Sequence, residues 1–337
     1  MSDGDFAGRL AAAVARQIGK PATLHDLQRL TGGATKTTWA FDADVNGARG
    51  KFIVQLASFA TTGVPDPLAG IGAHLSADED AHLMIAAAKV GVPAPRVYAI
   101  LDDSDGLGAG YITGRVDGET LGPRIVRDDR FAAPRAIMAD RCGRILAAIH
   151  SVDLAQVPFL KRYGAVEQIA TQRKVVDHYR FRLPAIEFGL RWAAEHAPTP
   201  SRHTAVHGDF RNGNLIVGDD GIRCVLDWEI GHSGDPMEDV GWVCVKTWRF
   251  GGKPPVGGFG TREQLFAGYE KASGHSVDPA SVRFWEAFGG VRWAIGCLRK
   301  GLRYTDGTEP ISIEQSAIGR RIEEPLWDYL NLIEGKD

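Results

Sequence analysis

The spacing of apolar residues changes once along this chain of 337 residues, and that change constrains the fold most strongly. Between residues 37 and 56, apolar side chains occupy alternate positions on both sides of an Asn46-Gly47 pair, which is typical of a β-hairpin with a two-residue turn. From Pro134 onward they recur every three or four residues, as on amphipathic helices. A sheet-rich part followed by a helix-rich part predicts an α+β protein with two lobes and a cleft between them.

Local signals predict the elements of the sheet-rich part. Apolar residues at every fourth position from Phe6 to Ile18 indicate an amphipathic helix, and three antiparallel strands follow, with a Gly-rich turn at residues 31–35 between the first two. Ser76 to Glu79 is a capping-box signature for a helix that runs to about Lys89. Short strands are expected through Ile100 and over residues 111–113. We expect an N-terminal lobe at residues 1–113, a hinge at 114–116 and a helical lobe at 117–337.

Composition excludes several classes of function. The chain has 39 Lys and Arg against 42 Asp and Glu, a net charge of −3, without the basic surplus of nucleic-acid-binding proteins. No run approaches the roughly 18 apolar residues of a membrane span, and the first residues do not resemble a secretion signal. We expect a cytoplasmic protein that binds neither nucleic acid nor membrane, of unpredicted oligomeric state. No two cysteines have C-x-x-C spacing, so free buried thiols are expected at Cys142, Cys224, Cys244 and Cys297.

The residues most typical of catalysis lie between positions 207 and 229. The segment His207–Asn214 reads HGDFRNGN, an apolar hairpin follows, and residues 227–229 read DWE. If Asp220-Gly221 is a two-residue turn, Leu215 pairs with Leu226 and Asn214 lies opposite Asp227. A four-residue loop would shift this register by two positions and still leave the two oxygen-bearing side chains as neighbours.

Such a hairpin end has a defined chemistry. Amide and carboxylate oxygens, here from Asn214 and Asp227, are ligands suited to Mg²⁺ that carries phosphates. Asp209 precedes Asn214 by five residues, in the loop that enters the hairpin, where a carboxylate can accept a hydroxyl proton.

The order His-x-Asp-x-x-x-x-Asn, followed by an apolar-flanked Asp, resembles the catalytic arrangement of protein-kinase-like phosphotransferases. The HGD form with DWE, in place of Asp-Phe-Gly, is similar to the aminoglycoside phosphotransferase family and its small-molecule kinase relatives. The resemblance covers most of residues 25–245 and includes LTGGA at 30–34, VPAP at 92–95, VDGE at 116–119, IH at 149–150 and GDP at 234–236.

The resemblance implies a two-lobed protein-kinase-like fold with a small antiparallel sheet lobe and a larger, mainly helical lobe. It implies Asp209 as catalytic base and Asn214 and Asp227 as Mg²⁺ ligands, with Glu229 near a second ion. Arg211 contacts either the transferring phosphoryl group or an acidic side chain. The residues implied for binding ATP or GTP belong to the Gly-rich turn, the third strand and the hinge: Gly32, Gly33, Ala34, Thr35, Lys36, Gln55, Thr113, Gly114 and Arg115.

The chain departs from the family pattern at one ion pair. The family places a basic residue on the third strand, paired with an acid on the next helix, and the corresponding positions here are Gln55 and Asp80, with Glu79 adjacent. A glutamine supplies no cation for the phosphates. Lys36, beside the Gly-rich turn, is a candidate substitute. The alternative is that Gln55 points into the core of the small lobe, because strand side chains alternate and an error of one residue reverses the face.

Three other polar residues have simpler structural interpretations. His207 is expected to be a hydrogen-bonding residue rather than a proton carrier, because Asp209 already supplies the base. His150 ends an amphipathic helix and is expected in the core. Asp235, before Pro236, is expected to cap a helix N-terminus.

These observations predict a Mg²⁺-dependent transfer of the γ-phosphoryl group of ATP or GTP to a hydroxyl of a small molecule. The acceptor is not necessarily an aminoglycoside, because residues 280–337 hold nine acids and eight Lys or Arg, without the acidic excess that a polycation would need. Five tryptophans beyond residue 240 suit an apolar or aromatic alcohol, or an acyl-linked hydroxy acid, equally well. The alternative function is a nucleotide-binding regulator with little or no turnover.

Overall fold

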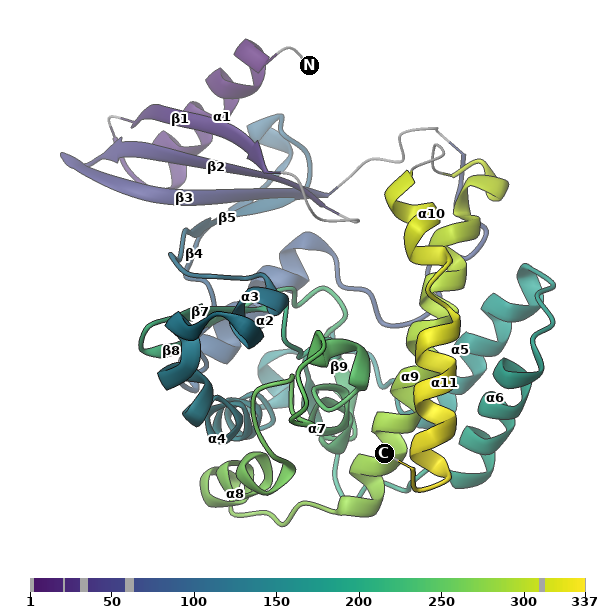
Figure 1. Cartoon of the computed structure of the whole chain (residues 1–337). Coiled ribbons are helices and arrows are strands. Elements are labelled where there is room, and N and C mark those ends of the chain that lie inside the picture. Colours follow the sequence, from purple (N-terminus) through teal and green to yellow (C-terminus); the bar gives the residue numbers. More distant parts are fainter. Residues whose placement is uncertain (1–2, 21, 31–35, 58–63, 309–312, 337) are drawn as a thin grey trace.

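The computed structural model describes residues 3–20, 22–30, 36–57, 64–308 and 313–336. It has two lobes, a small one built on a sheet and a larger helical one below it (Figure 1). The predicted α+β, protein-kinase-like fold class is therefore confirmed. The Gly-rich turn that carries Gly32, Gly33, Ala34 and Thr35 lies outside the described residues.

An antiparallel sheet of five strands, in the order β1-β2-β3-β5-β4, forms the small lobe. Its strands are β1 (Ala22–Leu30), β2 (Lys36–Val45), β3 (Ala48–Ala57), β4 (Val97–Leu101) and β5 (Gly110–Gly114). The predicted hairpin joins β2 to β3 through Asn46 and Gly47, both at positive φ (53° and 81°), as a tight turn of this type requires. Alternate side chains of β2 and β3, among them Phe41 and Phe52, are buried on one face.

That buried face is covered by α1 (Asp3–Gln17), whose Phe6, Leu10 and Val14 join the strand side chains in a separate small-lobe core. The predicted amphipathic helix is thus confirmed. The other face of the sheet is left toward the larger lobe, so side chains at the intervening strand positions point to the space between the lobes.

The helix α2 (Ala77–Lys89) connects the lobes physically. Its capping box is present, with the Glu79 carboxylate accepting the backbone N–H of Ser76 at 2.9 Å. Its apolar side chains, such as Leu83 and Met84, belong to the core of the larger lobe although the helix follows β3 in the chain. Any side chain that α2 directs at the sheet is consequently held in a fixed place between the two cores.

The larger lobe is mainly helical and also contains two pairs of short strands (Figure 1). Its helices are α3 (Gly122–Arg127), α4 (Ala132–Ile149), α5 (Ala165–His178), α6 (Pro184–His196), α7 (Met237–Trp242), α8 (Arg262–Ser273), α9 (Pro279–Leu302), α10 (Ile313–Gly319) and α11 (Glu323–Ile333). The strand pairs are β6 (Thr204–Val206) with β9 (His232–Gly234), and β7 (Leu215–Gly218) with β8 (Gly221–Val225). The predicted apolar face of α4 is buried, and all four cysteines are buried free thiols. Within the described residues, no helix has the length and apolar character to cross a bilayer.

Helices α4 and α8 approach so closely that only glycine fits at their crossing. A Cβ on Gly143 of α4 would lie 2.1 Å from the Leu265 carbonyl oxygen and 2.6 Å from the Tyr269 amide nitrogen, both backbone atoms of α8. We expect Gly143→Ala to lower the free energy of unfolding by about 1–3 kcal/mol, because the two helices must move apart. Denaturant unfolding of both variants measures the effect.

Gly8→Ala in α1 is the matched control, since a Cβ there meets nothing within 4 Å. It changes the same residue type in a helix interior and should be neutral or raise stability by up to about 1 kcal/mol through helix propensity. Equal effects of the two substitutions would contradict the packing argument.

Candidate active site

The hairpin that follows the catalytic motif has a different register from the predicted one. The turn is Asp219-Asp220, one position earlier than expected, and the β7–β8 pairing shifts at a bulge, so that Leu215 pairs with Val225 rather than Leu226. The predicted Leu215–Leu226 register was therefore wrong: the earlier turn alone would pair Leu215 with Cys224, and the extra residue of the bulge in β8 moves the pairing back by one, to Val225. Asn214 lies opposite Leu226, whose N–H its carbonyl accepts at 2.8 Å.

Asp227 is one residue past that pair, at a left-handed backbone position (φ 67°). A non-glycine residue in this region is uncommon and is often found at functional sites. The residue has solvent-accessible surface, but protein atoms surround much of its carboxylate. This burial, together with the charges of Glu229 and Asp209, raises the pKa of Asp227 to about 7.

The Asp209 carboxylate is held by three side-chain donors. Its Oδ1 accepts Arg211 Nε at 3.0 Å and Trp242 Nε1 at 2.8 Å, and its Oδ2 accepts Asn214 Nδ2 at 2.7 Å. The structure thus brings together Asp209, Arg211 and Asn214 as the motif suggested and adds Trp242, which the sequence showed only as a core or substrate-lining aromatic. The indole N–H that reaches Asp209 has no signal in local spacing.

Aromatic rings extend from Asp209 along one wall. The Arg211 guanidinium lies 4.3 Å from the centre of the Trp248 ring, and Trp248 contacts both Trp242 and Trp293 at ring separations of 5.3 and 4.9 Å. Arg211 is therefore fixed from two sides, by the carboxylate and by a ring face.

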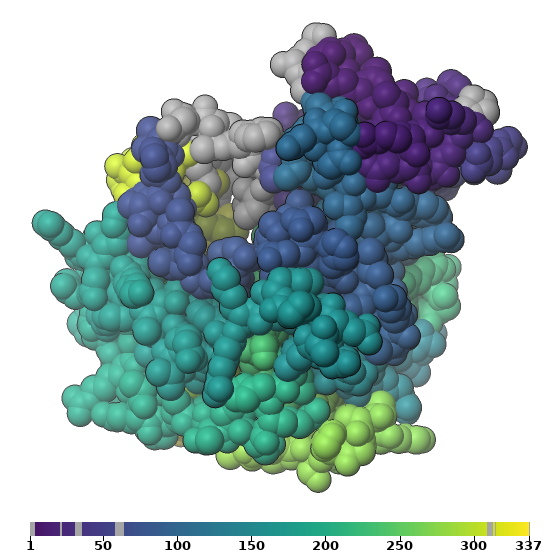
Figure 2. Space-filling model, turned by 180° about the vertical axis from the view of Figure 1, so that it is seen from behind, coloured from purple at the N-terminus to yellow at the C-terminus, as the bar shows by residue number. Residues whose placement is uncertain are grey.

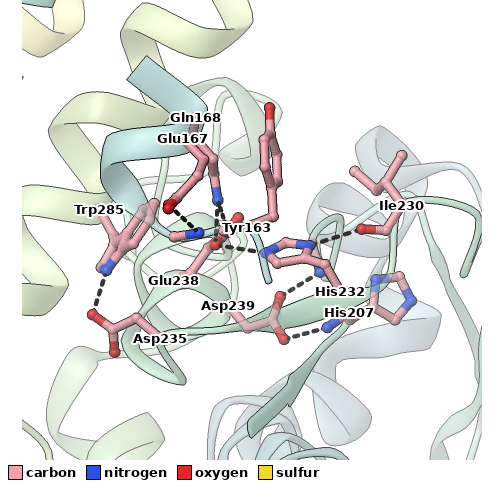
Figure 3. Close-up of polar contacts among 12 residues, drawn as sticks. Tyr163, Glu167, Gln168, His207, Ile230, His232, Asp235, Glu238, Asp239 and Trp285 are labelled. Carbon is pink, nitrogen blue, oxygen red and sulfur yellow. Dashed lines mark hydrogen bonds and ion pairs between the residues drawn. The ribbon is translucent and has the colours of Figure 1, made fainter. Parts of the chain in front are cut away.

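The loop that carries the base is anchored from behind by α7. Both oxygens of the buried Asp239 accept backbone N–H groups, from His207 at 2.8 Å and Gly208 at 2.9 Å (Figure 3). His150, a core histidine as predicted, lies 3.2 Å from Asp239 and 3.0 Å from the hydroxyl of Tyr269. This contact joins Asp239 to a loop 32 residues earlier in the chain, which no local spacing indicates.

His207 is structural, as expected. Its Nδ1 accepts the N–H of Asp209 at 3.1 Å, so its Nε2 carries the hydrogen that bonds the Leu226 carbonyl at 3.1 Å. Burial lowers the pKa of His207, which keeps the ring neutral. The ring therefore ties the catalytic loop to the end of the hairpin. Asp235 accepts the N–H of Met237 at the start of α7, as predicted for a cap.

A second acid of α7, the buried Glu238, lies in a charged network beside this loop (Figure 3). It contacts His232 at 3.0 Å, Gln168 at 2.6 Å and Arg292 at 2.7 Å. Arg292 also lies over the Trp242 ring at 4.6 Å, so the network supports the indole that bonds the base. Consecutive acids Glu238 and Asp239 thus stabilise two sides of the site.

Lys36 occupies the position of the missing cation. Its Nζ contacts Asp80 of α2 at 2.5 Å and Glu229 of the larger lobe at 3.2 Å. Burial lowers the pKa of Lys36, but the two carboxylates outweigh burial and raise it, so the group is an ammonium. Gln55 faces the same space, with its Oε1 2.7 Å from the hydroxyl of Tyr111, which is itself 2.8 Å from Asp80. The alternative that Gln55 points into the small-lobe core is wrong.

The residues predicted to contact the nucleotide at the hinge form hydrogen bonds within or beside the small-lobe sheet. Thr113 is buried within β5, and Gly114 and Arg115 donate their backbone N–H groups to the carbonyls of Arg96 and Lys51. The Arg115 side chain forms an ion pair with β2 at 2.9 Å. These residues border the cleft, but their amide groups are already used.

Among the described residues, no three His, Cys, Asp or Glu side chains gather in a ready metal-binding set. The donors nevertheless fit Mg²⁺, which binds proteins through one or two carboxylates and completes its shell with phosphates and water. Asp227 and Asn214 supply such a pair, since Asn214 donates through Nδ2 and keeps its Oδ1 as an acceptor. Burial first, and then the charges of Glu229 and Asp209, raise the pKa of Asp227, and a bound cation would stabilise the charged carboxylate.

A cavity of about 530 Å³ opens beside Asp209, a size typical of small-molecule sites. Trp242 and Trp293 line it near the base, and α5, α9 and the segment before α2 form its other walls. Seen from behind, that segment (residues 64–76) lies against helices of the larger lobe (Figure 2).

The fold and this arrangement define a protein-kinase-like phosphotransferase of the small-molecule kinase type. The chain belongs to the phosphotransferase enzyme family, whose model matches residues 26–285. The resemblance inferred from the motifs is thereby confirmed.

Solved structures share the fold across the chain. A putative aminoglycoside phosphotransferase from Ralstonia eutropha is 24% identical with a TM-score of 0.72, and the match covers 96% of this chain and 97% of that one. An aminoglycoside phosphotransferase in complex with GDP and kanamycin is 17% identical (TM-score 0.61; 96% and 98% covered). Choline kinase from Streptococcus pneumoniae is 12% identical (TM-score 0.58; 96% and 99% covered).

Curated relatives are larger proteins. Acyl-CoA dehydrogenase family member 10 of Mus musculus is 32% identical over 198 residues, which is 54% of this chain and 18% of that protein. Family member 11 of Gallus gallus is 27% identical over 180 residues, 49% of this chain and 22% of that protein. This chain therefore matches about a fifth of the length of these relatives.

The His232–Glu238 pair makes a pH-dependent contribution to stability. Both ring nitrogens of His232 contact acceptors, the Ile230 carbonyl at 2.9 Å and Glu238 at 3.0 Å; burial lowers its pKa, but Glu238 outweighs burial and raises it above 6.5. The contribution is therefore complete below about pH 6.5 and is lost as the pH rises through the native pKa. We expect His232→Gln to cost on the order of 3 kcal/mol at pH 6 and progressively less toward pH 9, measured by denaturant unfolding.

His82→Gln is the matched control, because His82 is exposed on α2. It should change stability little at any pH in this range. A deficit for His232→Gln that is constant, or that grows with pH, would show that the ring is not the charged partner of Glu238.

Proposed function

We propose that the protein transfers the γ-phosphoryl group of ATP or GTP to a hydroxyl group of a small molecule, with Mg²⁺ as cofactor. The observation that carries this proposal is the Asp209 carboxylate, held by three donors at the wall of a cavity large enough for an acceptor. Family membership and solved relatives in complex with AMP-PNP or GDP support the use of a nucleotide.

The hydrogen bonds around Asp209 support one of its two oxygens as the atom that receives the proton. Oδ1 accepts two donors, Arg211 and Trp242, which use both of its lone pairs, whereas Oδ2 accepts only Asn214. Oδ2 therefore accepts the acceptor's hydroxyl hydrogen, which orients the oxygen for attack on the phosphorus and takes up the proton as the bond forms.

Lys36 supplies the positive charge for the nucleotide phosphates in place of a lysine on β3. Its ammonium has three donors and lies between Asp80 and Glu229, next to the end of β2 that meets the Gly-rich turn. At the hinge, the backbone N–H groups of Gly114 and Arg115 are used by the sheet, and Val116 is the next residue. We propose that the backbone N–H of Val116 donates a hydrogen bond to the purine ring of the nucleotide.

Asn214 and Asp227 would hold Mg²⁺. Glu229, which contacts Lys36, would lie near a second Mg²⁺ ion. A bound Mg²⁺ neutralises phosphate charge and orients the transferring group. The carboxylate of Asp227 is the side chain on which this binding depends most, since burial, and after it the charges of Glu229 and Asp209, disfavour its charged form, which a cation would stabilise.

Asp209→Asn should abolish phosphotransfer, with a loss of at least about 100-fold, while the fold and Mg-ATP affinity stay near those of the wild type, because the base does not contact the phosphates in the ground state. ADP release with a library of hydroxy compounds measures turnover, and thermal shift with Mg-ATP measures binding. The matched control is Asp219→Asn in the exposed hairpin turn. Wild-type turnover in Asp209→Asn would end this mechanism.

Lys36→Met should weaken Mg-ATP binding by about ten- to hundredfold, the value of a charge contact of about 1–3 kcal/mol. Adding Gln55→Lys should restore part of the affinity, because Asp80 Oδ1 is buried and has no hydrogen-bond partner among the described residues, and the Tyr111 hydroxyl lies close to both Gln55 and Asp80. Calorimetry measures the affinities, and unfolding curves confirm that each variant is folded.

Lys51→Met on β3 is the control, as Lys51 is half-exposed and pairs with the exposed Asp117. If Lys36→Met and the control bind Mg-ATP equally well, Lys36 does not supply the charge. Tight Mg-ATP binding without turnover of any acceptor would favour the regulator.

A further inference from the structure

The cavity beside Asp209 has a basic lining. Two carboxylates line it, those of Asp66 and Asp209. Four Lys or Arg side chains also line it, and all four come from α9 or the turn that follows it: Arg292, Arg299, Lys300 and Arg303. An aminoglycoside carries several positive charges, which this lining would repel. The positive charge of the cavity lining therefore indicates which class of acceptor the cavity binds.

Two of these cations leave positive charge at the cavity: Arg299 shares one carboxylate with Arg303, and Lys300 has no carboxylate partner among the described residues. Arg299 donates to Asp66 at 2.9 Å, but the same carboxylate oxygen also lies 3.5 Å from Arg303. The Nε of Arg299 is buried and has no hydrogen-bond partner in the described part of the chain. Lys300 lies 5.8 Å from the centre of the Trp293 ring, and no carboxylate of the described residues is within ion-pair distance of it. The positive charge that Arg299 and Lys300 leave uncompensated is what an anionic ligand in the cavity would bind.

The spacing of residues along α9 gives the distance between this positive charge and Asp209. Arg292 reaches the Gly208 carbonyl, next to the base, at 3.5 Å. Arg299 follows it by seven residues on the same helix, which corresponds to an axial distance of about 10 Å. The positive end of the cavity is thus remote from the reacting hydroxyl.

We propose that the acceptor is an elongated hydroxy compound with an anionic group, a carboxylate or a phosphate ester, about 10 Å from the hydroxyl. The anion binds Arg299 and Lys300, and the apolar middle of the molecule lies along Trp293 and Trp242. This inference rests on the proposed phosphotransfer and specifies its substrate class. The guanidinium pairs with both oxygens of such an anion, which fixes the position of the far end of the acceptor.

Four probes of equal chain length separate charge from size. They are ω-hydroxydecanoate, ω-hydroxydecyl phosphate, the uncharged α,ω-decanediol and the cationic ω-aminodecanol. Wild-type protein should phosphorylate at least one of the two anions with a kcat/KM at least about tenfold above that of the diol, and the amine should be poorest. The better anion identifies the headgroup. Equal values for anions and diol, or preference for the amine, would overturn the proposal.

Variants test the residues. Arg299→Gln and Lys300→Gln should each reduce the ratio of anion to diol kcat/KM by about tenfold, whereas Arg191→Gln, an exposed arginine on α6, should leave the ratio unchanged. Lys300→Gln breaks no ion pair among the described residues, so it remains informative if Arg299→Gln unfolds. An unchanged ratio in Lys300→Gln and in folded Arg299→Gln would overturn the assignment.

Calorimetry of the preferred anion without nucleotide keeps this inference separate from the phosphotransfer proposal. Binding to the wild type that weakens in the Lys300→Gln variant supports the anion site even if no probe is phosphorylated, and that result would count against phosphotransfer alone. Turnover of the diol without anion binding would have the opposite meaning: phosphotransfer would stand and the anion site would fall.

Discussion

The ammonium group of Lys36 connects the parts of this molecule that must meet for catalysis. It contacts Asp80 on α2 and Glu229 beyond the β7–β8 hairpin, so the sheet, the helix and the larger lobe converge on a single charge. Asp80 is 1% exposed, and a carboxylate buried to this degree needs a cation. Because Gln55 cannot supply one, the protein satisfies this need from β2 rather than β3. Lys36 is also the residue that directly follows the Gly-rich segment 31–35 in the sequence.

The site is supported by charges that the substrate does not reach. Glu238 and Asp239, consecutive on α7, are both buried, and each is neutralised by a different set of partners. Asp239 holds the backbone of the catalytic loop, and Glu238 holds Arg292, which packs on the ring of Trp242. The orientation of the Asp209 carboxylate therefore depends on α7 as much as on its own loop. In such networks the removal of one partner leaves another buried charge unpaired, which explains why they are costly to alter.

Much of the fold could be predicted from local patterns. The alternation around Asn46-Gly47, the stripe on α1 and the capping box of α2 act within a few residues, and the structure has all three. The motif of residues 207–214 likewise brings Asp209 and Asn214 together, since the two residues are only five positions apart in one loop. The predicted hairpin register was wrong because the turn lies one position earlier than the Asp-Gly signal indicated, and the bulge in β8 offsets only part of that shift.

The sequence by itself determined the two lobes, the order of their elements and the residues of the catalytic loop, because periodicity and turn chemistry are short-range properties of the chain. Only the tertiary structure decided that Lys36 forms the ion pair with Asp80, that Trp242 donates a hydrogen bond to Asp209 and that Arg299 and Lys300 line the cavity. These contacts join residues tens to hundreds of positions apart. Their distances follow from how α2, α7 and α9 pack against the sheet and the hairpin, and no local spacing records that packing.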